Sequence, residues 1–145
     1  MVRHTMITVF IDTSVLLSAC LSKTGASAFI LGFCRKKKIK GIISKYVLSE
    51  LKRNAEKLDQ LGKRRLNFYI LQSHLIIVDN PTLEETKICE KVINSKDTPI
   101  LAVAMKNKVN YLVTLNIKDF LLPKVKNFVK SLIILTPRDF VMLVK

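Results

Sequence analysis

Short runs of β-branched and other apolar residues alternate along this chain with longer segments of helical period. The runs read as strands cover residues 7–11, 40–44, 111–114 and 131–135. Such alternation is typical of βαβ units, in which parallel strands form a central sheet covered by helices. We therefore expect an α/β fold with a mainly parallel sheet. The 145 residues suffice for one domain, spanning 1–145.

Helical period and capping signals fill the intervals between these runs. The predicted helices cover residues 14–34 with a break near 23–25, residues from 45 onward, 63–74, 82–93, 98–106, and residues from 136 onward. Thr82 and Glu85 fit a capping box, and Pro99 and Pro137 suit first helical turns. Residues 75–78 read either as a short strand or as a return of the chain into the core.

The first apolar run argues against export. Arg3 and His4 precede it, but Asp12 interrupts it after a few residues, which does not fit a signal peptide. Elsewhere the sequence lacks the roughly 18 uncharged apolar residues that a membrane helix needs. We therefore expect a cytoplasmic protein that does not associate with membranes. No CxxC pair is present, so we expect no zinc site or disulfide, and buried free thiols at Cys20, Cys34 and Cys89.

The net charge of +14 favours a polyanionic partner, and nucleic acid is the one we predict. The alternative is that lysine is merely abundant on solvated helix faces. The basic residues form clusters: Arg35, Lys36, Lys37, Lys38 and Lys40; then Lys63, Arg64 and Arg65; then Lys118, Lys124, Lys126 and Lys130. Of these, we expect Arg35 to Lys38 and Lys118 to contact phosphate. His4 and His74 have no recognisable catalytic partner.

Four of the eleven acidic residues stand at the ends of predicted elements. Asp12 follows the first strand, Glu50 lies one turn into the helix after the second, and Asp97 begins the helix before the third. Asp119 lies just beyond that third strand. Because the carboxyl ends of parallel strands gather at one edge of an open sheet, where ligands bind, the fold can bring these acids together.

Gathered carboxylates repel one another and raise each other's pKa values unless a cation lies between them. Mg²⁺ or Mn²⁺ fits, because hard cations take oxygen ligands and bridge carboxylates to phosphate. With a phosphodiester as substrate, such an ion neutralises charge and activates an attacking water. The candidate catalytic and metal-binding acids are Asp12, Glu50, Asp97 and Asp119.

Each candidate also has a purely structural interpretation. Asp12 and Asp97 could cap the helices that follow them, and Asp119 could cap the short turn at Phe120. Glu50 could be a surface acid that pairs with a nearby Lys or Arg. Hydroxyls at Thr13, Ser14 and Thr114 could be helix caps, or they could hold the carboxylates or metal-bound waters in place. Cap and ligand roles are compatible.

Five segments, in this order and spacing, resemble the PIN-domain ribonucleases, especially the VapC-like toxins of toxin-antitoxin pairs. They are FIDTSVLLSA, ISKYVLSEL, KDTPILAVA, YLVTLNIKDF and IILTPRDF, and together they cover almost the whole chain. No one of these motifs is specific. Their combination carries the resemblance.

The resemblance implies a three-layer α/β/α sandwich, an acidic pocket for Mg²⁺ or Mn²⁺, and endonucleolytic cleavage of RNA. By position, Asp12, Glu50 and Asp97 match the family's first three acids, with Thr13 or Ser14 supporting Asp12. Asn116 stands where family members often have a fourth acid, and Asp119 matches another frequent one; the change to Asn implies a weaker second-metal site. The family also implies a homodimer and, for toxins, a small antitoxin partner.

Other domain classes share the first of these features. Receiver domains and haloacid-dehalogenase-like phosphatases also place an Asp after the first strand. The latter need a second Asp where Ser14 stands, and receivers need a further acid pair near the N-terminus. The remaining alternative is a PIN-type module that binds RNA without cleaving it, which Asn116 keeps open.

Overall fold

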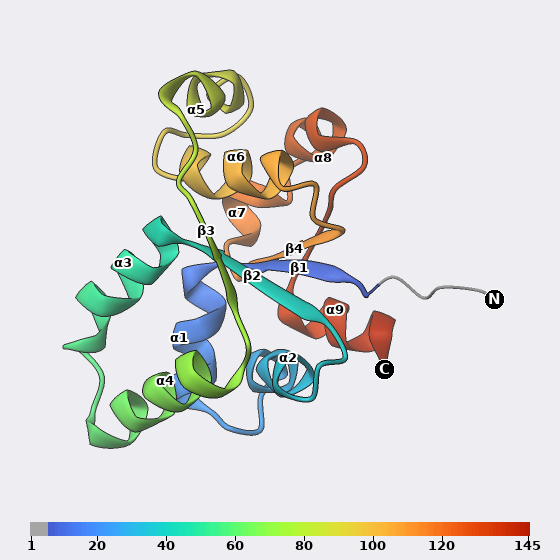
Figure 1. Ribbon diagram of the computed structural model, residues 1–145. Helices are drawn as coiled ribbons and strands as arrows, with labels where there is room; N and C mark the ends of the chain where they lie inside the picture. Colours follow the sequence, from blue (N-terminus) through green and yellow to red (C-terminus); the bar gives the residue numbers. More distant parts are fainter. Residues whose placement is uncertain (1–5) are drawn as a thin grey trace.

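Five short strands form one sheet in the order β3-β2-β1-β4-β5, and all four pairings are parallel (Figure 1). The computed structural model describes residues 6–145, so the expectation about Arg3 and His4 lies outside the described residues. The strands are β1 (Thr8–Ile11), β2 (Lys40–Ser44), β3 (Ile76–Val78), β4 (Tyr111–Val113) and β5 (Ile133–Leu135). The predicted parallel α/β fold is confirmed.

Helices cover both faces of this sheet and make the protein a three-layer α/β/α sandwich (Figure 1). One face carries α1 (Thr13–Leu21), α2 (Ala26–Arg35), α3 (Lys45–Ala55), α4 (Gln60–Gln72) and α9 (Pro137–Val144). The other carries α5 (Leu83–Cys89), α6 (Thr98–Lys106), α7 (Ile117–Phe120) and α8 (Pro123–Val129). The sandwich that the family resemblance implied is therefore present.

The strand order reverses direction at β1. From β1 the chain steps outward through β2 to β3, and it then crosses back to add β4 and β5 on the other side of β1. In open parallel sheets such a reversal opens a crevice outside the carboxyl ends of the two strands, and ligands bind there. In this protein the crevice lies beyond the ends of β1 and β4.

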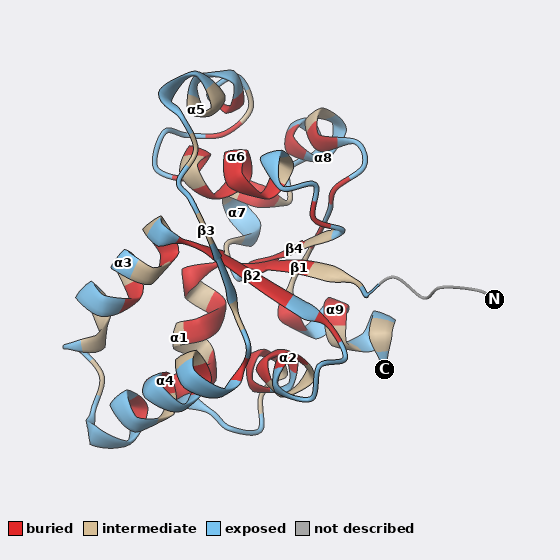
Figure 2. Cartoon of the chain, viewed as in Figure 1, coloured by how far each residue is buried: buried red, intermediate tan, exposed pale blue. Residues whose placement is uncertain are grey.

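The core lies on both faces of the central strands (Figure 2). Val9, Phe10 and Ile11 of β1 are fully buried, which is why the first apolar run does not alternate with polar residues. All three cysteines are buried and free, as predicted.

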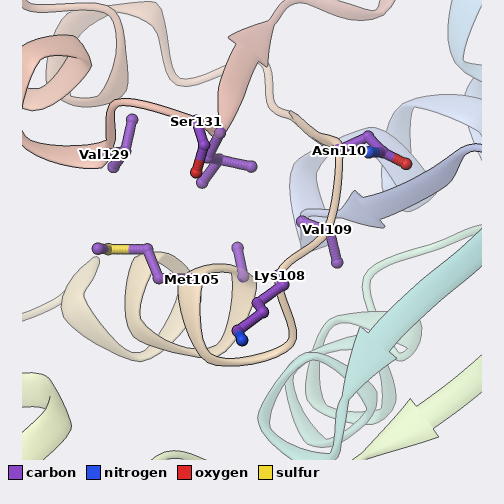
Figure 3. A pocket seen from close by; sticks show the side chains of 8 residues that line it. Met105, Lys108, Val109, Asn110, Val129 and Ser131 are labelled. Carbon is purple, nitrogen blue, oxygen red and sulfur yellow. The ribbon is translucent and has the colours of Figure 1, made fainter.

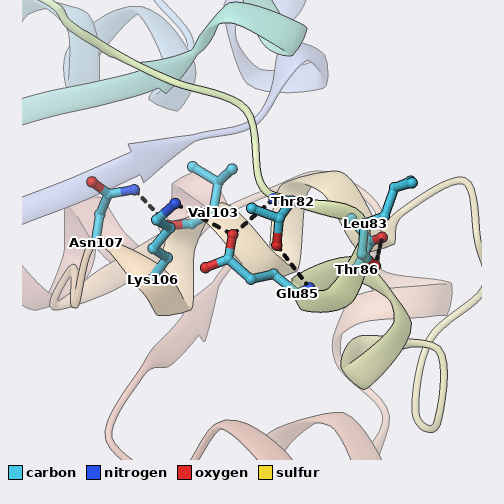
Figure 4. Close-up of polar contacts among 7 residues, drawn as sticks. All are labelled: Thr82, Leu83, Glu85, Thr86, Val103, Lys106 and Asn107. Carbon is cyan, nitrogen blue, oxygen red and sulfur yellow. Dashed lines mark hydrogen bonds and ion pairs between the residues drawn. The ribbon is translucent and has the colours of Figure 1, made fainter.

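Local capping explains where several helices begin. The predicted capping box is present: the N–H of Thr82 donates to Glu85 Oε1 at 2.8 Å, and the N–H of Glu85 donates to Thr82 Oγ1 at 3.2 Å (Figure 4). The helix α4 begins before the predicted residue 63 because the Asp59 carboxylate accepts the N–H of Gly62 at 2.7 Å. Helix α5 ends at Cys89, short of the predicted residue 93.

Two helices were not predicted. Both α7 and α8 fill the interval between β4 and β5, and α8 begins with Pro123. Its buried residues Val125 and Val129 are four positions apart and form its inner face.

Within residues 6–145 no single helix has the length and apolar composition to cross a membrane. Helices α1 and α2 meet these two criteria only when taken together, and the chain bends by 102° between them.

Candidate active site

A pocket of about 240 Å³ opens where the strand order reverses. Its walls come from the end of β1, the start of α1, one face of α3, and the segments that open α6 and α7. The lining residues are Asp12, Thr13, Ser14, Leu17, Tyr46, Glu50, Asn54, Lys96, Asp97, Ile100 and Asn116. Three of the four acids singled out from sequence therefore share one pocket.

Asp12 is held by three donors at the N-terminus of α1. Its Oδ1 accepts the N–H of Thr13 at 2.8 Å, and its Oδ2 accepts the hydroxyls of Thr114 at 2.7 Å and Ser14 at 3.2 Å. Burial raises the pKa of the Asp12 carboxyl, against the effect of these hydrogen bonds, and the nearby Glu50 raises it further. Asp12 is thus both a helix cap and a fixed carboxylate in the pocket.

Thr13 connects Asp12 to Glu50. While its N–H donates to Asp12, its hydroxyl donates to Oε1 of Glu50 at 2.7 Å. Glu50 forms no ion pair with any Lys or Arg in the described part of the chain, which removes the reading of it as one half of a surface ion pair.

Asp97 has an unsatisfied carboxylate oxygen. It stands at the N-terminus of α6 but its side chain makes no cap hydrogen bond, and Oδ2 is buried without any hydrogen-bond partner. Burial raises the pKa of the Asp97 carboxyl, and Asp119 raises it further, while Asn94 and Lys96 act in the opposite direction. A buried carboxylate oxygen without a donor is costly, so this atom is suited to a cation.

Asn116 lies in the pocket, whereas Asp119 lies beside it. Asn116 lines the pocket and caps α7, where its Oδ1 accepts the N–H of Asp119 at 3.3 Å. Asp119 lies close to Asp97 but does not line the pocket. The short turn at Phe120 is therefore capped by Asn116 and not by Asp119.

The pocket offers the oxygen donors that a hard divalent cation prefers. These oxygens belong to the carboxylates of Asp12, Glu50 and Asp97 and to the amide of Asn116. Binding a cation would stabilise Asp97 Oδ2 most, because this oxygen has no hydrogen-bond partner. In residues 6–145 no three acidic, His or Cys side chains stand close enough to enclose a metal ion by themselves. The metal ligand set therefore stays a prediction.

The largest basic cluster lies away from this pocket. Arg35 to Lys38 close α2 and lead into the start of β2, whereas Asp12 follows the end of β1. Because Lys40 pairs with Thr8, the cluster and the pocket are separated by the length of the strands, about 13 Å at 3.3 Å per residue. Arg35 is engaged with Phe68, its guanidinium lying 5.8 Å from the ring centre. Lys118 is exposed on α7.

Sequence reasoning missed several residues of the pocket. Tyr46 and Asn54 flank Glu50 at a spacing of four, which places all three on one face of α3, and that spacing was the available signal. Burial and the nearby carboxylates, that of Glu50 first, raise the pKa of the Tyr46 hydroxyl. Lys96, next to Asp97, is the one basic side chain among the described lining residues.

Comparison with protein families shows which family this chain belongs to. The family model described as PIN domain matches residues 8–118. This chain belongs to the PIN-domain family. The match begins at β1 and includes Asp12, Glu50, Asp97 and Asn116, so the family predicted from five short motifs is confirmed. No curated protein sequence matches the chain.

Several solved structures share this fold. VapBC2 from Rickettsia felis, bound to a promoter DNA fragment, aligns with a TM-score of 0.63 at 20% identity over 90% of this chain and 98% of that one. DNA-bound VapBC from Salmonella typhimurium aligns with a TM-score of 0.64 at 19% identity over 91% and 99%. VapC20 from Mycobacterium tuberculosis, described as a toxin that cleaves the sarcin-ricin loop, aligns with a TM-score of 0.51 at 14% identity over 72% and 86%.

Proposed function

We propose that this PIN-domain protein is an endoribonuclease that uses Mg²⁺ or Mn²⁺ to hydrolyse phosphodiester bonds of RNA. The observation that carries the proposal is the placement of Asp12, Glu50 and Asp97, from three separate elements, around one pocket with an unpartnered carboxylate oxygen. The net charge of +14 supports a polyanionic substrate.

In the proposed mechanism Asp12, Glu50 and Asp97 would hold the cation, and the amide oxygen of Asn116 would be a further ligand. When bound, such an ion neutralises charge on the scissile phosphate and lowers the pKa of an attacking water. The chain's own part is to fix the carboxylates. Thr13 orients both Asp12 and Glu50 with one backbone and one side-chain donor.

Two further residues define the charge of the pocket. Asn116 brings an amide oxygen but no negative charge to the pocket, which would weaken a second metal site. Lys96 brings a positive charge to the same pocket and is available to bind a phosphate oxygen of the substrate.

We also propose that the protein is the toxin of a toxin-antitoxin pair, acts in the cytoplasm and forms a homodimer. The shared fold with VapC proteins supports this, since two of the compared structures are VapBC complexes. A small open reading frame directly upstream of the gene would favour the toxin role. Co-expression should then yield a stable complex in which cleavage is inhibited; a co-expressed product that neither binds nor inhibits would contradict an antitoxin role for it.

The decisive experiment compares the wild-type protein with Asp12→Asn on mixed single-stranded and structured RNA, with Mn²⁺, with Mg²⁺ and with chelator. We expect cleavage only by the wild type and only with metal. Equal cleavage by both proteins would point to a contaminant or another site. If neither cleaves but both bind RNA, the protein is a PIN-type RNA-binding module.

A further inference from the structure

The edge of the sheet opposite the pocket has an unusual backbone pattern. Each of the four turns that lead from a helix into β2, β3, β4 or β5 contains one residue with positive φ: Lys37 at 60°, His74 at 54°, Lys108 at 51° and Lys130 at 48°. No glycine in residues 6–145 has a positive φ. Glycine adopts this conformation with the least strain, yet a basic residue occupies it in every case.

Two of these turns show that the backbone does not require lysine. At the end of α2 the N–H of Lys37 donates to the carbonyl of Cys34 at 3.0 Å, and the N–H of Lys38 donates to that of Phe33 at 2.9 Å. This is the Schellman arrangement, whose left-handed position is usually glycine, and α6 ends in the same way at Lys108. The lysine side chains therefore need another explanation.

Helix dipoles supply only part of it. Cations stabilise the carboxyl ends of helices, but Arg35, Lys106 and Lys126 already occupy the last turns of α2, α6 and α8. Lys37 and Lys108 lie two positions past these ends and add a second cation to helix termini that already carry one.

Acidic residues are absent from one edge of the sheet, while the opposite edge carries both signs of charge, including the Lys45–Asp79 ion pair and Lys96. The four helix-to-strand turns, residues 36–39, 73–75, 107–110 and 130–132, contain no acidic residue. At the opposite edge Asp12 and Asp79 directly follow strands, and Asp139 lies in the first turn of the helix after β5. In the described part of the chain none of the turn lysines forms an ion pair.

Two recesses interrupt the basic edge, and each is flanked by lysine. A pocket of about 380 Å³ lies between the turn after α6 and the turn after α8, with Lys108 and Ser131 on opposite sides of it (Figure 3). A second, of about 350 Å³, lies between the turn after α2 and the end of α9 and is lined by Lys38 and Lys145. Across five strands the edge is about 19 Å wide.

We propose that this edge, defined by Lys36, Lys37, Lys38, Lys108, Lys130 and Lys145, is a second RNA-binding surface that anchors the phosphate backbone of a large RNA away from the acidic pocket. The exposed lysines at the rims of its recesses bind phosphates, and the absence of acidic residues from its turns avoids repulsion. The choice of RNA as the polyanion rests on the proposed function. Binding at this edge needs neither metal nor the pocket carboxylates.

The backbone pattern offers a variant that removes charge without straining the fold. Lys37→Gly, Lys108→Gly and Lys130→Gly together delete three cations at positions that glycine prefers, so thermal stability should be unchanged or higher. The matched control is Lys57→Gln, Lys87→Gln and Lys91→Gln, which removes three exposed cations away from this edge. Binding of a long structured RNA is measured in chelator, so that cleavage does not intervene.

We expect the edge variant to bind the long RNA about tenfold more weakly or worse, and the slope of log affinity against log salt to flatten by about 2. The control variant should show smaller changes in both the RNA affinity and the salt slope. With metal, the edge variant should cleave a short oligonucleotide that fills only the pocket as fast as the wild type does, and cleave the long RNA more slowly.

Several results would overturn the proposal: unchanged RNA affinity in the edge variant, an equal loss in the control, or a loss of binding to vesicles of anionic phospholipid without any loss for RNA. Failure of the proposed nuclease function would look different. Neither RNA would be cleaved with metal, while edge-dependent binding in chelator would persist.

Discussion

The hydroxyl of Thr114, at the end of β4, donates a 2.7 Å hydrogen bond to Oδ2 of Asp12, at the end of β1, across 102 positions of sequence. Both residues are buried, with exposed fractions of 0% and 8%. The bond links the two central strands where the sheet order reverses, so it couples the fold directly to the acidic pocket.

Thr114→Val should therefore affect both stability and cleavage. The substitution keeps the shape of the side chain but removes a donor to a buried carboxylate, which we expect to lower the free energy of unfolding by about 1.5–3 kcal/mol. Because the Thr114 hydroxyl lowers the pKa of Asp12, its loss raises that pKa further and reduces cleavage near neutral pH. Urea unfolding and a pH-rate profile test this. The exposed Thr24→Val is the control, and a variant as stable and active as that control would contradict the prediction.

The position of the acids could be predicted from sequence because it follows from topology. Once the predicted strands at 7–11 and 111–114, which are β1 and β4 of the structure, are recognised as parallel neighbours, Asp12 and the residues after Val113 must lie at the same edge of the sheet. The same logic places Arg35 to Lys38 at the other edge, since they precede a strand, but charge alone does not indicate which phosphate they would contact.

The remaining site residues depended on details that sequence does not carry. Lys96 is one of many lysines, and only the fold shows that it faces the acids. Asp97 was predicted as a metal ligand with a helix cap as the alternative; its carboxylate makes no cap bond, which depends on a side-chain orientation that sequence does not give. The helix α8 was missed because a seven-residue segment with two inward valines gives little periodic signal.

An added methyl group should be unfavourable at Gly41 and favourable at Gly32. A Cβ at Gly41 on β2 would lie 2.8 Å from both Cys34 Sγ and Leu75 Cδ2, so Gly41→Ala is expected to destabilise the protein by about 1–3 kcal/mol through overpacking. Gly32 lies within α2 with no atom inside 4 Å of such a Cβ, so Gly32→Ala should stabilise by about 0.5–1 kcal/mol. Denaturant midpoints of the two variants should move in opposite directions, and parallel shifts would refute the packing argument.

Asp97→Asn is expected to stabilise the metal-free protein at neutral pH. Because burial raises the pKa of Asp97, its contribution to stability is present below the ordinary value of 3.8 and is lost as pH rises through the raised value. The advantage of the variant in chelator should therefore shrink as pH falls. Mn²⁺ should reverse the order, because it would stabilise only the wild type. A variant less stable than the wild type in chelator at every pH would show that the carboxylate is satisfied.

Asn116→Asp tests whether a further carboxylate in the pocket strengthens metal binding. Asp can still accept the N–H of Asp119 and cap α7, so the fold should be retained. A further carboxylate in the pocket should tighten Mn²⁺ binding about tenfold, since affinity rises with ligand charge. Titration calorimetry measures both affinity and stoichiometry; a second bound ion would identify Asn116 as the residue that limits the wild type to one. Unchanged binding would place Asn116 outside the metal site.

Lys96→Gln should lower cleavage and strengthen metal binding at once. Loss of a charge-assisted hydrogen bond to phosphate is expected to reduce kcat/KM by about 10- to 100-fold. The same substitution removes a positive charge beside Asp97, where Lys96 now lowers the pKa of the carboxyl, so Mn²⁺ should bind more tightly than to the wild type. A residue needed only for folding would weaken both properties together. Lys96→Arg keeps the charge and should stay closer to wild type than Lys96→Gln in both measurements, because both cations donate charge-assisted hydrogen bonds to phosphate. Tighter metal binding with undiminished cleavage would place Lys96 beside the metal ligands but away from the substrate.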